Sequence, residues 1–474
     1  MRNKSLKLLS SLIMIAPVGV VFLPGCSSSN IVVGNFESYM SQDLMDEMKK
    51  EFGCQFLYYD TNETVETKFE RNYDIAIPSS YEAMILKKKG QLSKIDWAAF
   101  NMVADDGTKE GKPVKNAQDA KLLFSDTIKD VINAQDDLYQ GMGYLTKDES
   151  VLDYGIPYFL QSWMFAYKGC PAIDNLEKEG ITWNDVAKEV GNNNYFKPTT
   201  SAEIACIDDV RTFYGMSKMT YDQINEVAEI DWNINPTTAD QSVAQYQKEY
   251  DSFVKNFSSR SFYFNSDSNQ VLLSLADPNG VNGAFCYNGD ALYALTGGGI
   301  DRWKDLWTDA DDNFHAVMPR ETVITIDMLV FNKKNDNNPT RKQKVYDIAK
   351  KITLEGGSKD DDIAAVDEDD NYINGPMINF DFVMYTAPLK NLNDYVLADD
   401  GYIVENYEDK QQLFRKMYDI KVPSNPDLAK HLFEQPLSDL DKSNMHLACE
   451  PEKVKLYNDI SNWNILRRYK YCHY

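Results

Sequence analysis

Between residues 31 and 90, runs typical of buried strands alternate with segments of helical periodicity, and this order limits the possible folds more than any other feature. The alternation, strands first, follows the order 31–33, 42–52, 56–59, 64–71, 73–77 and 81–89. Gly53 and Gly90 stand where two of the helices should end, a position that favours glycine. Strand followed by helix, three times over, predicts a doubly wound parallel sheet.

Two segments follow predicted strands at the edge where such sheets bind ligands. In open α/β sheets the ligand lies beyond the carboxyl ends of the strands. Residues 35–39 follow the first strand, residues 78–81 follow the third, and both segments are rich in aromatic and hydroxyl groups. The sequence therefore predicts binding residues in both segments. Helix capping is an alternative role for the serines, Ser80 in particular.

The α/β pattern continues in the second part of the chain. Strands are predicted at 283–287, 315–318 and 323–331, the end of a helix at 208–214, a helix at 341–352, and an acidic surface insertion at 360–375. A chain of 474 residues is long enough for two or three domains of about 150 residues each.

The N-terminus has the features of a secretory signal peptide. Three basic residues precede an uncharged apolar run at 8–23, and the sequence Leu-Pro-Gly-Cys then ends at Cys26. This run is shorter than the roughly 18–20 residues of a membrane-spanning helix. The segment resembles a bacterial lipoprotein signal, which implies that residues 1–25 are removed, that Cys26 carries the lipid and that residues 26–30 form a polar tether. An uncleaved membrane anchor is the alternative, and both place the remaining chain outside the cytoplasm.

The charge balance of the chain is acidic. The 73 Asp and Glu residues outnumber the 49 Lys and Arg residues, and the formal net charge is −24. Such a surface argues against nucleic acid and anionic lipid as partners, and it raises the local concentration of cations. A purely solubilising surface has the same composition, so the charge by itself selects no ligand.

The motifs of common enzymes and metal sites are incomplete. Only three residues separate the glycines at 107 and 111, one too few for a phosphate loop, and the stretch at 309–320 lacks the glycine and glutamate of a calcium loop. No G-x-S-x-G or H-E-x-x-H sequence occurs, and no nucleophile–base pair is visible. The six cysteines after Cys26 include no C-x-x-C pair and allow 15 disulfide pairings. We therefore predict no enzyme activity, metal or cofactor. We favour buried free thiols over disulfides, whose pairing the sequence cannot choose.

A series of short motifs occurs in one order along the chain. They lie at 35–39, 62–64, 73–81, 156–158, 264–267, 287–289, 318–321 with Asp327, and 385–388. In sequence and order they resemble spermidine/putrescine-binding proteins of polyamine ABC transporters, over most of residues 30–390. Beyond about residue 390 no motif matches.

The resemblance implies a type II periplasmic-binding-protein fold, in which two doubly wound α/β lobes joined by crossovers enclose a ligand cleft. Residues 30–155 and 326–386 would form the first lobe, and residues 156–325 and 387–474 the second. It also implies a polyamine ligand, an ABC permease and its ATPase subunits as partners, and no cofactor. The lipid anchor would hold the protein at the extracellular face of the plasma membrane or in the periplasm.

The resemblance also carries ligand-binding positions over to this chain, and these are Phe36, Tyr39, Ser79, Tyr81, Tyr287, Asp327 and Tyr385. The methylene chain of a polyamine favours flat apolar walls, and its ammonium groups favour carboxylates and aromatic faces. Asp327 is the best candidate partner for one ammonium, because it lies inside an apolar, strand-like run. The chain has alanines near the place of the family's second acidic pair, so Glu203, Glu37 and Asp290 are candidates for the second ammonium.

Other functions remain open at this stage. The protein could bind another small cation or organic solute, or it could be a surface lipoprotein that acts as an adhesin or antigen. A secreted hydrolase is the weakest alternative. Carboxylates that face aromatic rings would favour the polyamine receptor, and arginines in their place would favour an anionic ligand.

Overall fold

The computed structural model describes most of the chain between residues 30 and 403. The described residues are 30–141, 143–168, 173–178, 180–196, 204–207, 216, 220, 223, 262–265, 267–276, 280–295, 314–317, 319 and 324–403. Cys26, Glu203 and the helix predicted at 208–214 lie outside them. Within these ranges, nine strands form one sheet, and β4 (Val103–Ala104) and β5 (Lys112–Pro113) form a separate pair.

The predicted alternation of strands and helices is confirmed in the N-terminal part of the chain. The elements are β1 (Val32–Phe36), α1 (Gln42–Phe52), β2 (Gln55–Tyr59), α2 (Asn62–Asn72), β3 (Ile75–Ala76) and α3 (Ser80–Lys88). β1 lies between β2 and β3 and pairs in parallel with both. α1 buries Leu44, Met45 and Met48 and ends at Gly53, whose φ of 59° suits glycine. The carboxyl ends of β1 and β3 therefore meet at one edge of the sheet.

A long strand, β6 (Gly155–Lys168), crosses the middle of the sheet. Its first half pairs antiparallel with β11 (Ile324–Phe331). Its second half pairs with β9 (Gly283–Tyr287) on one edge and with β10 (Phe314–Val317) on the other. Every residue of β6 before Lys168 is buried, so the run shows no alternation of apolar and polar residues. For this reason β6 is absent from the sequence-based prediction.

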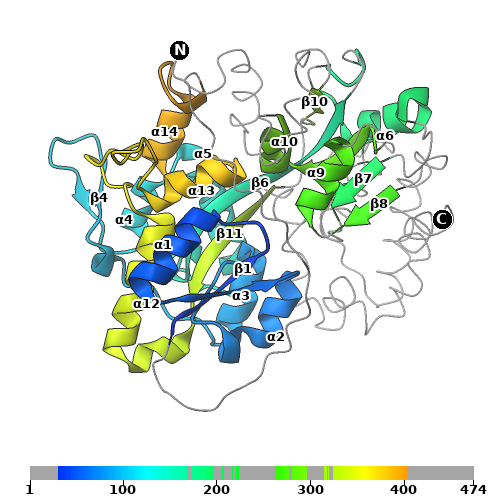
Figure 1. Ribbon diagram of the computed structural model, residues 1–474. Helices are drawn as coiled ribbons and strands as arrows, with labels where there is room; N and C mark the ends of the chain where they lie inside the picture. Colours follow the sequence, from blue (N-terminus) through cyan, green and yellow to red (C-terminus); the bar gives the residue numbers. More distant parts are fainter. Residues whose placement is uncertain are drawn as a thin grey trace. The chain divides into compact units, whose positions relative to one another are not determined.

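Three parallel strands lie on each side of the antiparallel pair β11 and β6. The order across the sheet is β2-β1-β3-β11-β6-β9-β7-β8, where β7 spans Ile204–Ile207 and β8 spans Phe262–Asn265. β7 pairs in parallel with β8, which lies beside it in Figure 1, and with β9, just as β1 pairs with β2 and β3. Two parallel α/β halves joined by shared strands are what a type II periplasmic-binding-protein fold requires, and the predicted fold class is confirmed.

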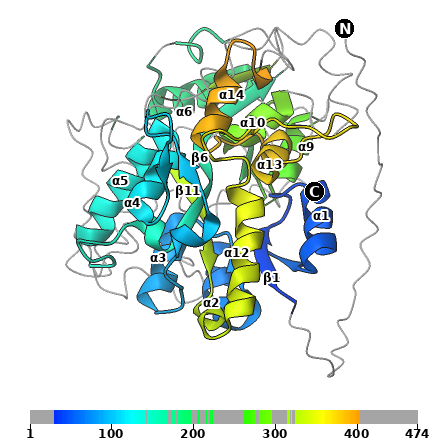
Figure 2. The same cartoon turned by 90° about the vertical axis from the view of Figure 1, so that its left-hand side faces the viewer.

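The remaining helical elements complete both halves. They are η1 (Trp97–Phe100), α4 (Ala117–Ala120), η2 (Lys121–Leu123), α5 (Asp126–Gly141), η3 (Val151–Asp153), α6 (Trp183–Asn192), η4 (Asn194–Phe196), α9 (Ser268–Ala276), α10 (Asn288–Leu295), η6 (Lys333–Asn337), α12 (Pro339–Thr353), α13 (Gly375–Val383) and α14 (Lys390–Leu397). α1, α12 and α13 pack side by side (Figure 2). The acidic insertion predicted at 360–375 consists of turns and one isolated bridge as far as residue 374. In the described parts of the chain, no helix has the length and apolar character needed to cross a membrane.

The strands β6 and β11 are two crossings between the halves of the sheet. A third crossing runs beside β6 at Thr386. Leu160 and Thr386 exchange two backbone hydrogen bonds, of 3.1 and 3.2 Å. Shortly afterwards Leu389 forms a bridge with Phe124, a residue of the N-terminal part of the chain. The segment after the crossing therefore contacts elements assigned to the first lobe, whereas the resemblance places 387–474 in the second. The division into lobes stays a prediction.

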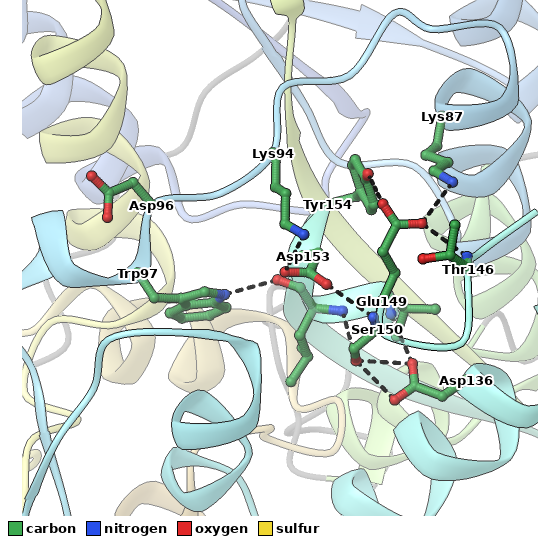
Figure 3. Close-up of polar contacts among 12 residues, drawn as sticks. Lys87, Lys94, Asp96, Trp97, Asp136, Thr146, Glu149, Ser150, Asp153 and Tyr154 are labelled. Atoms are coloured by element: carbon green, nitrogen blue, oxygen red, sulfur yellow. Dashed lines mark hydrogen bonds and ion pairs between the residues drawn. The ribbon is translucent and has the colours of Figure 1, made fainter. Parts of the chain in front are cut away.

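The residues just before β6 are held by a network of ion pairs and hydrogen bonds (Figure 3). Asp136 of α5 accepts hydrogen bonds from the Ser150 hydroxyl at 2.8 Å and from the Val151 amide at 2.7 Å. Asp153 accepts the Ser150 amide at 3.0 Å and pairs with the Lys94 ammonium at 3.3 Å. These contacts fix the start of the crossing strand against α5.

Glu149 belongs to the same network (Figure 3). Its carboxylate accepts the Thr146 amide at 2.9 Å, pairs with the Lys87 ammonium at 3.2 Å and accepts a hydrogen bond from the Tyr154 hydroxyl. Burial by itself would raise the pKa of Glu149, but the hydrogen bonds from Thr146, Tyr154 and Lys87 outweigh it and lower the pKa to about 2. The folded protein therefore keeps Glu149 ionised far into the acidic range.

We expect Glu149→Gln to lower the free energy of unfolding at pH 7 by about 1–3 kcal/mol, because glutamine keeps the size of the side chain and loses its charge. A carboxylate with a depressed folded pKa stabilises the protein above its unfolded pKa, and this contribution is lost as the pH falls through the folded value. The difference between wild type and variant should therefore shrink between pH 4.5 and about 2 in urea titrations. The exposed Glu110→Gln is the control, and a difference that does not change with pH would contradict the prediction.

Candidate ligand-binding site

Asp327 is a buried acidic residue near the middle of the sheet, with 2% of its surface exposed. The Met328 amide donates to the Pro78 carbonyl at 2.8 Å, and Ser79 forms an isolated antiparallel bridge with Asp327. A bulge in the pairing of β11 with β6 follows directly after Asp327, and bulges redirect side chains. The segment after β3 is thereby brought against the Asp327 carboxylate.

Three side chains donate hydrogen bonds to the Asp327 carboxylate. The Tyr39 hydroxyl donates to Oδ2 at 2.8 Å, the Ser79 hydroxyl to Oδ1 at 2.7 Å and the Gln161 amide to Oδ2 at 2.7 Å. The Gln161 amide also donates to the Tyr39 oxygen at 2.6 Å. All three donors are neutral, so these bonds orient the carboxylate without cancelling its charge.

Asn62, at the start of α2, holds Ser79 in place. Its Oδ1 accepts a hydrogen bond from the Ser79 amide at 3.0 Å, and its Nδ2 donates one to the Ser79 hydroxyl at 3.1 Å. The capping alternative for the serines is wrong for α3, because Ser79 at the N-cap makes no side-chain cap bond and Ser80 Oγ accepts the Gln135 amide at 2.8 Å. Ser79 is instead one link in a hydrogen-bonded chain from Asn62 to Asp327.

Aromatic rings surround Tyr39. The centroid of its ring lies 5.2 Å from that of Tyr158 and 5.4 Å from that of Tyr385, both in edge-to-face contact. Phe36 and Phe159 lie farther out, each with its centroid 6.1 Å away. The Tyr158 hydroxyl also donates to the Tyr39 carbonyl at 2.6 Å. Tyr39 therefore connects the carboxylate to an aromatic cluster.

The two contacting tyrosines, Tyr39 and Tyr385, are each preceded by a residue in the left-handed region. Ser38 has a φ of 57° and Met384 a φ of 60°. A non-glycine residue in this conformation costs about 1–3 kcal/mol and persists where the surrounding contacts impose it. Backbone strain in this protein therefore occurs on both sides of the aromatic contact at the centre of the site.

A second buried carboxylate, Asp290 of α10, lies at the other end of this tyrosine pair. The Tyr385 hydroxyl donates to Asp290 Oδ1 at 2.6 Å, and the Tyr287 amide donates to Oδ2 at 3.3 Å. Burial raises the pKa of Asp290 to about 6, although these hydrogen bonds oppose the increase. A continuous set of contacts thus runs from Asp327 through Tyr39 and Tyr385 to Asp290.

Both tyrosine hydroxyls remain hydrogen-bond donors at neutral pH. Burial, and next the charge of Asp327, raises the pKa of Tyr39 well above its usual value. Burial, and next the charge of Asp290, does the same for the pKa of Tyr385. Protonated tyrosines therefore face a carboxylate at each end of the pair.

The first residues of α10 bring Asp290 against the crossings. Asn288 Oδ1 accepts the Ser162 amide of β6 at 3.0 Å, and Asn288 Nδ2 donates to Thr386 Oγ1 at 3.0 Å. Gly289 allows the close approach, because a Cβ at this position would collide with the ring of Tyr385. The helix that carries Asp290 is therefore tied to two of the three crossings.

The structure brings several of the sequence-predicted binding residues into one network, namely Tyr39, Ser79, Asp327, Tyr385 and, by ring contact, Phe36. Tyr81 is buried, and Tyr287 packs on Trp163 with centroids 5.1 Å apart. Glu37 is exposed, and Glu203 lies outside the described residues. The ligand-binding role of each residue stays a prediction.

The binding positions predicted from the sequence did not include the β6 residues of the network, Tyr158, Phe159 and Gln161. All three belong to β6, which the sequence pattern does not reveal as a strand. A signal was present, because Gln161 and Ser162 interrupt a long apolar run with two polar residues. Buried polar residues in such a run need partners, and this need points to a site.

A protein family described as hypothetical lipoprotein (MG045 family) matches residues 1–420. The chain belongs to the MG045 lipoprotein family. The matched region includes Cys26, the residue predicted to carry the lipid. No curated protein matches the sequence.

Several solved structures are similar to this chain. PotD, the spermidine/putrescine ABC transporter substrate-binding protein of Streptococcus pneumoniae, is 16% identical, with 88% of this chain and 98% of PotD covered and a TM-score of 0.45. The Tp0655 (TpPotD) lipoprotein of Treponema pallidum is 15% identical, with coverages of 68% and 80% and a TM-score of 0.41. UgpB of Mycobacterium tuberculosis, in complex with glycerophosphocholine, is 11% identical, with coverages of 90% and 100% and a TM-score of 0.45. The ligands in these names are those of the proteins named, and PotD belongs to the group that the sequence motifs resemble.

The raised pKa of Asp290 predicts how the stability of this MG045-family protein depends on pH. Because the folded pKa of about 6 exceeds the unfolded value of 3.8, the folded state binds more protons between these values, so ionising Asp290 destabilises the fold as the pH rises. Relative to Asp290→Asn, wild type should lose up to about 1.4 kcal/mol of unfolding free energy per pH unit across this interval.

Urea titrations of wild type and Asp290→Asn at pH 4, 5, 6 and 7, without ligand, measure this difference. Asp119→Asn is the control, since Asp119 is also buried but its pKa is lowered, first by the bond from Lys112. If the Asp290→Asn and Asp119→Asn curves both run parallel to the wild-type curve above pH 4, the pKa of Asp290 is not raised.

Proposed function

We propose that this lipoprotein is the extracytoplasmic solute receptor of an ABC importer and that it captures a small polyamine such as spermidine or putrescine. One observation carries the proposal: two buried carboxylates, Asp327 and Asp290, are linked through the edge-to-face pair Tyr39 and Tyr385. Two acids with aromatic rings between them match a molecule that has a cation at each end and a methylene chain between.

The energies of such contacts are sufficient for a receptor. A hydrogen bond to a charged group contributes about 1.5–3 kcal/mol, and a cation over an aromatic ring contributes about 0.5–2 kcal/mol. A micromolar affinity corresponds to about 8 kcal/mol. Two ammonium groups and a few aromatic walls therefore supply enough free energy, even after the loss of ligand freedom.

The oriented carboxylate supports a cationic ligand in a second way. Tyr39, Ser79 and Gln161 orient the Asp327 oxygens through hydrogen bonds within the protein itself. A preformed acceptor loses little freedom on binding, so more of the contact energy appears as affinity. Asp327 would bind one ammonium, and Asp290 is the candidate for the second.

Membership of a lipoprotein family supports the proposed location. A lipid on Cys26 would hold the receptor at the outer face of the plasma membrane, or in the periplasm, next to its permease. The permease and its ATPase subunits would be its protein partners, and the acidic surface argues against nucleic acid. The receptor itself would carry out no chemistry.

We expect Asp327→Asn to reduce polyamine affinity roughly 30-fold or more, because it leaves a buried ammonium without its charged partner, at a cost of about 2–5 kcal/mol. Asparagine has nearly the same shape as aspartate, so the fold should survive. Calorimetric titration of wild type and variant with spermidine and putrescine measures the change.

Asp119→Asn is the matched control, because Asp119 is also a buried carboxylate but pairs with Lys112 at 2.7 Å, away from Asp327. It should bind polyamines as wild type does. Equal affinity of wild type and Asp327→Asn would show that the site lies elsewhere. If wild type binds neither amine, the proposal of a polyamine ligand is wrong. A thermal-shift screen with other cations, amino acids and sugars would then identify another solute.

Cys26→Ser should abolish lipid attachment and leave the protein unprocessed or released from the membrane. Partition of wild type and variant between the aqueous and detergent phases of Triton X-114 measures the effect. Serine lacks the thiol that accepts the lipid but differs little in size. Unchanged partition into detergent would contradict a lipid anchor at this position.

A further inference from the structure

The hydroxyl of Thr325 is a buried polar group next to the Asp327 carboxylate. Thr325 and Asp327 lie two residues apart on β11, opposite Gln161 and Phe159 of β6. Residues two apart on a strand point to the same face and are separated by roughly 6.6 Å along it. Only 6% of Thr325 is exposed, and in the described parts of the chain its Oγ1 has no hydrogen-bond partner.

A buried hydroxyl without a partner destabilises a folded protein, because it loses its hydrogen bonds with water and gains nothing in return. Valine has nearly the same shape and would avoid this loss. The Thr325 hydroxyl, on the same strand as a carboxylate that is already oriented, is therefore an acceptor available to a group from outside the described protein.

Gln161 shows that the Thr325 hydroxyl lies on the same face of the sheet as the Asp327 carboxylate. It stands opposite Thr325 in the β6–β11 pairing, and its amide donates to Asp327 Oδ2 at 2.7 Å. Directly opposite and diagonal side chains on one face of an antiparallel pair contact each other. The hydroxyl, the amide and the carboxylate therefore share one face of the sheet.

We propose that Thr325 Oγ1 accepts a hydrogen bond from the same ligand ammonium that Asp327 binds, so that this subsite selects ammonium groups that carry N–H donors. The inference rests on the proposed function and adds the class of cation to it. A primary ammonium has three donors and needs several acceptors around it. A quaternary ammonium has none, so it would leave the Thr325 hydroxyl without a hydrogen bond and would donate none to the carboxylate.

The chain provides a matched control in Ser162. Ser162 is fully buried, its Oγ likewise has no partner in the described parts of the chain, and it stands opposite Ile324 on β11. Neighbouring positions on a strand point to opposite faces, so the Ser162 hydroxyl lies on the other face from Thr325. Removing it tests the effect of a partnerless hydroxyl that is not at the subsite.

The experiment compares wild type, Thr325→Val, Thr325→Ser and Ser162→Ala by calorimetric titration with putrescine and with its fully N-methylated, bis-quaternary analogue. Thr325→Val should bind putrescine at least about tenfold more weakly than wild type, whereas Thr325→Ser and Ser162→Ala should bind as wild type does. Wild type should bind putrescine more tightly than the quaternary analogue, and Thr325→Val should reduce this preference.

Thermal unfolding of the ligand-free proteins separates binding from folding. Thr325→Val should melt at or above the wild-type temperature, because it removes a partnerless hydroxyl, so its weaker binding could not arise from a damaged fold. If wild type binds putrescine and Thr325→Val binds it equally well, the inference is overturned and the proposed function stands. Equal wild-type affinity for putrescine and its quaternary analogue also overturns the inference. If wild type binds no amine, the proposed function and the inference fail together.

Discussion

The arrangement of the site depends on keeping one carboxylate buried. Burial of a charge is costly unless hydrogen bonds compensate for the lost water, and Asp327 receives such bonds from Tyr39, Ser79 and Gln161. The three donors come from the segment after β1, the segment after β3, and β6. No single element supplies all three hydrogen bonds. The charge is therefore compensated only when β11 pairs with β6 in this register and also contacts the segment after β3.

The two acids of the site differ in the way they hold their charge. Three neutral donors orient Asp327, whereas burial raises the pKa of Asp290 to about 6. One end of the tyrosine pair thus carries a preformed acceptor, and the other carries a carboxyl group that titrates close to neutral pH. A cation near Asp290 would favour its ionised form, so binding and deprotonation would be coupled at that end.

Much of the first half could be predicted because its elements follow simple periods. The helix expected at 42–52 has the same bounds as α1, and the segments after β1 and β3, in which binding residues were predicted, both donate hydrogen bonds to Asp327. β6 could not be predicted, since a strand buried on both faces shows no period of two. Because β6 was not predicted, the role of Gln161 was not predicted either. The place of Asp290 depends on α10 packing on distant crossings, which local sequence patterns do not encode.

The burial of β6 has a consequence for the chain before it folds. From Gly155 to Tyr167 the strand contains no charged residue, and its partner β11 begins only at Ile324. A long, uncharged, aromatic-rich run that must wait for a distant partner combines the properties that promote intermolecular β-pairing. Pro157 near its start and Lys168 at its end are residues that hinder such pairing. The strand that joins the two halves of the folded sheet is thus also an aggregation hazard while the chain folds.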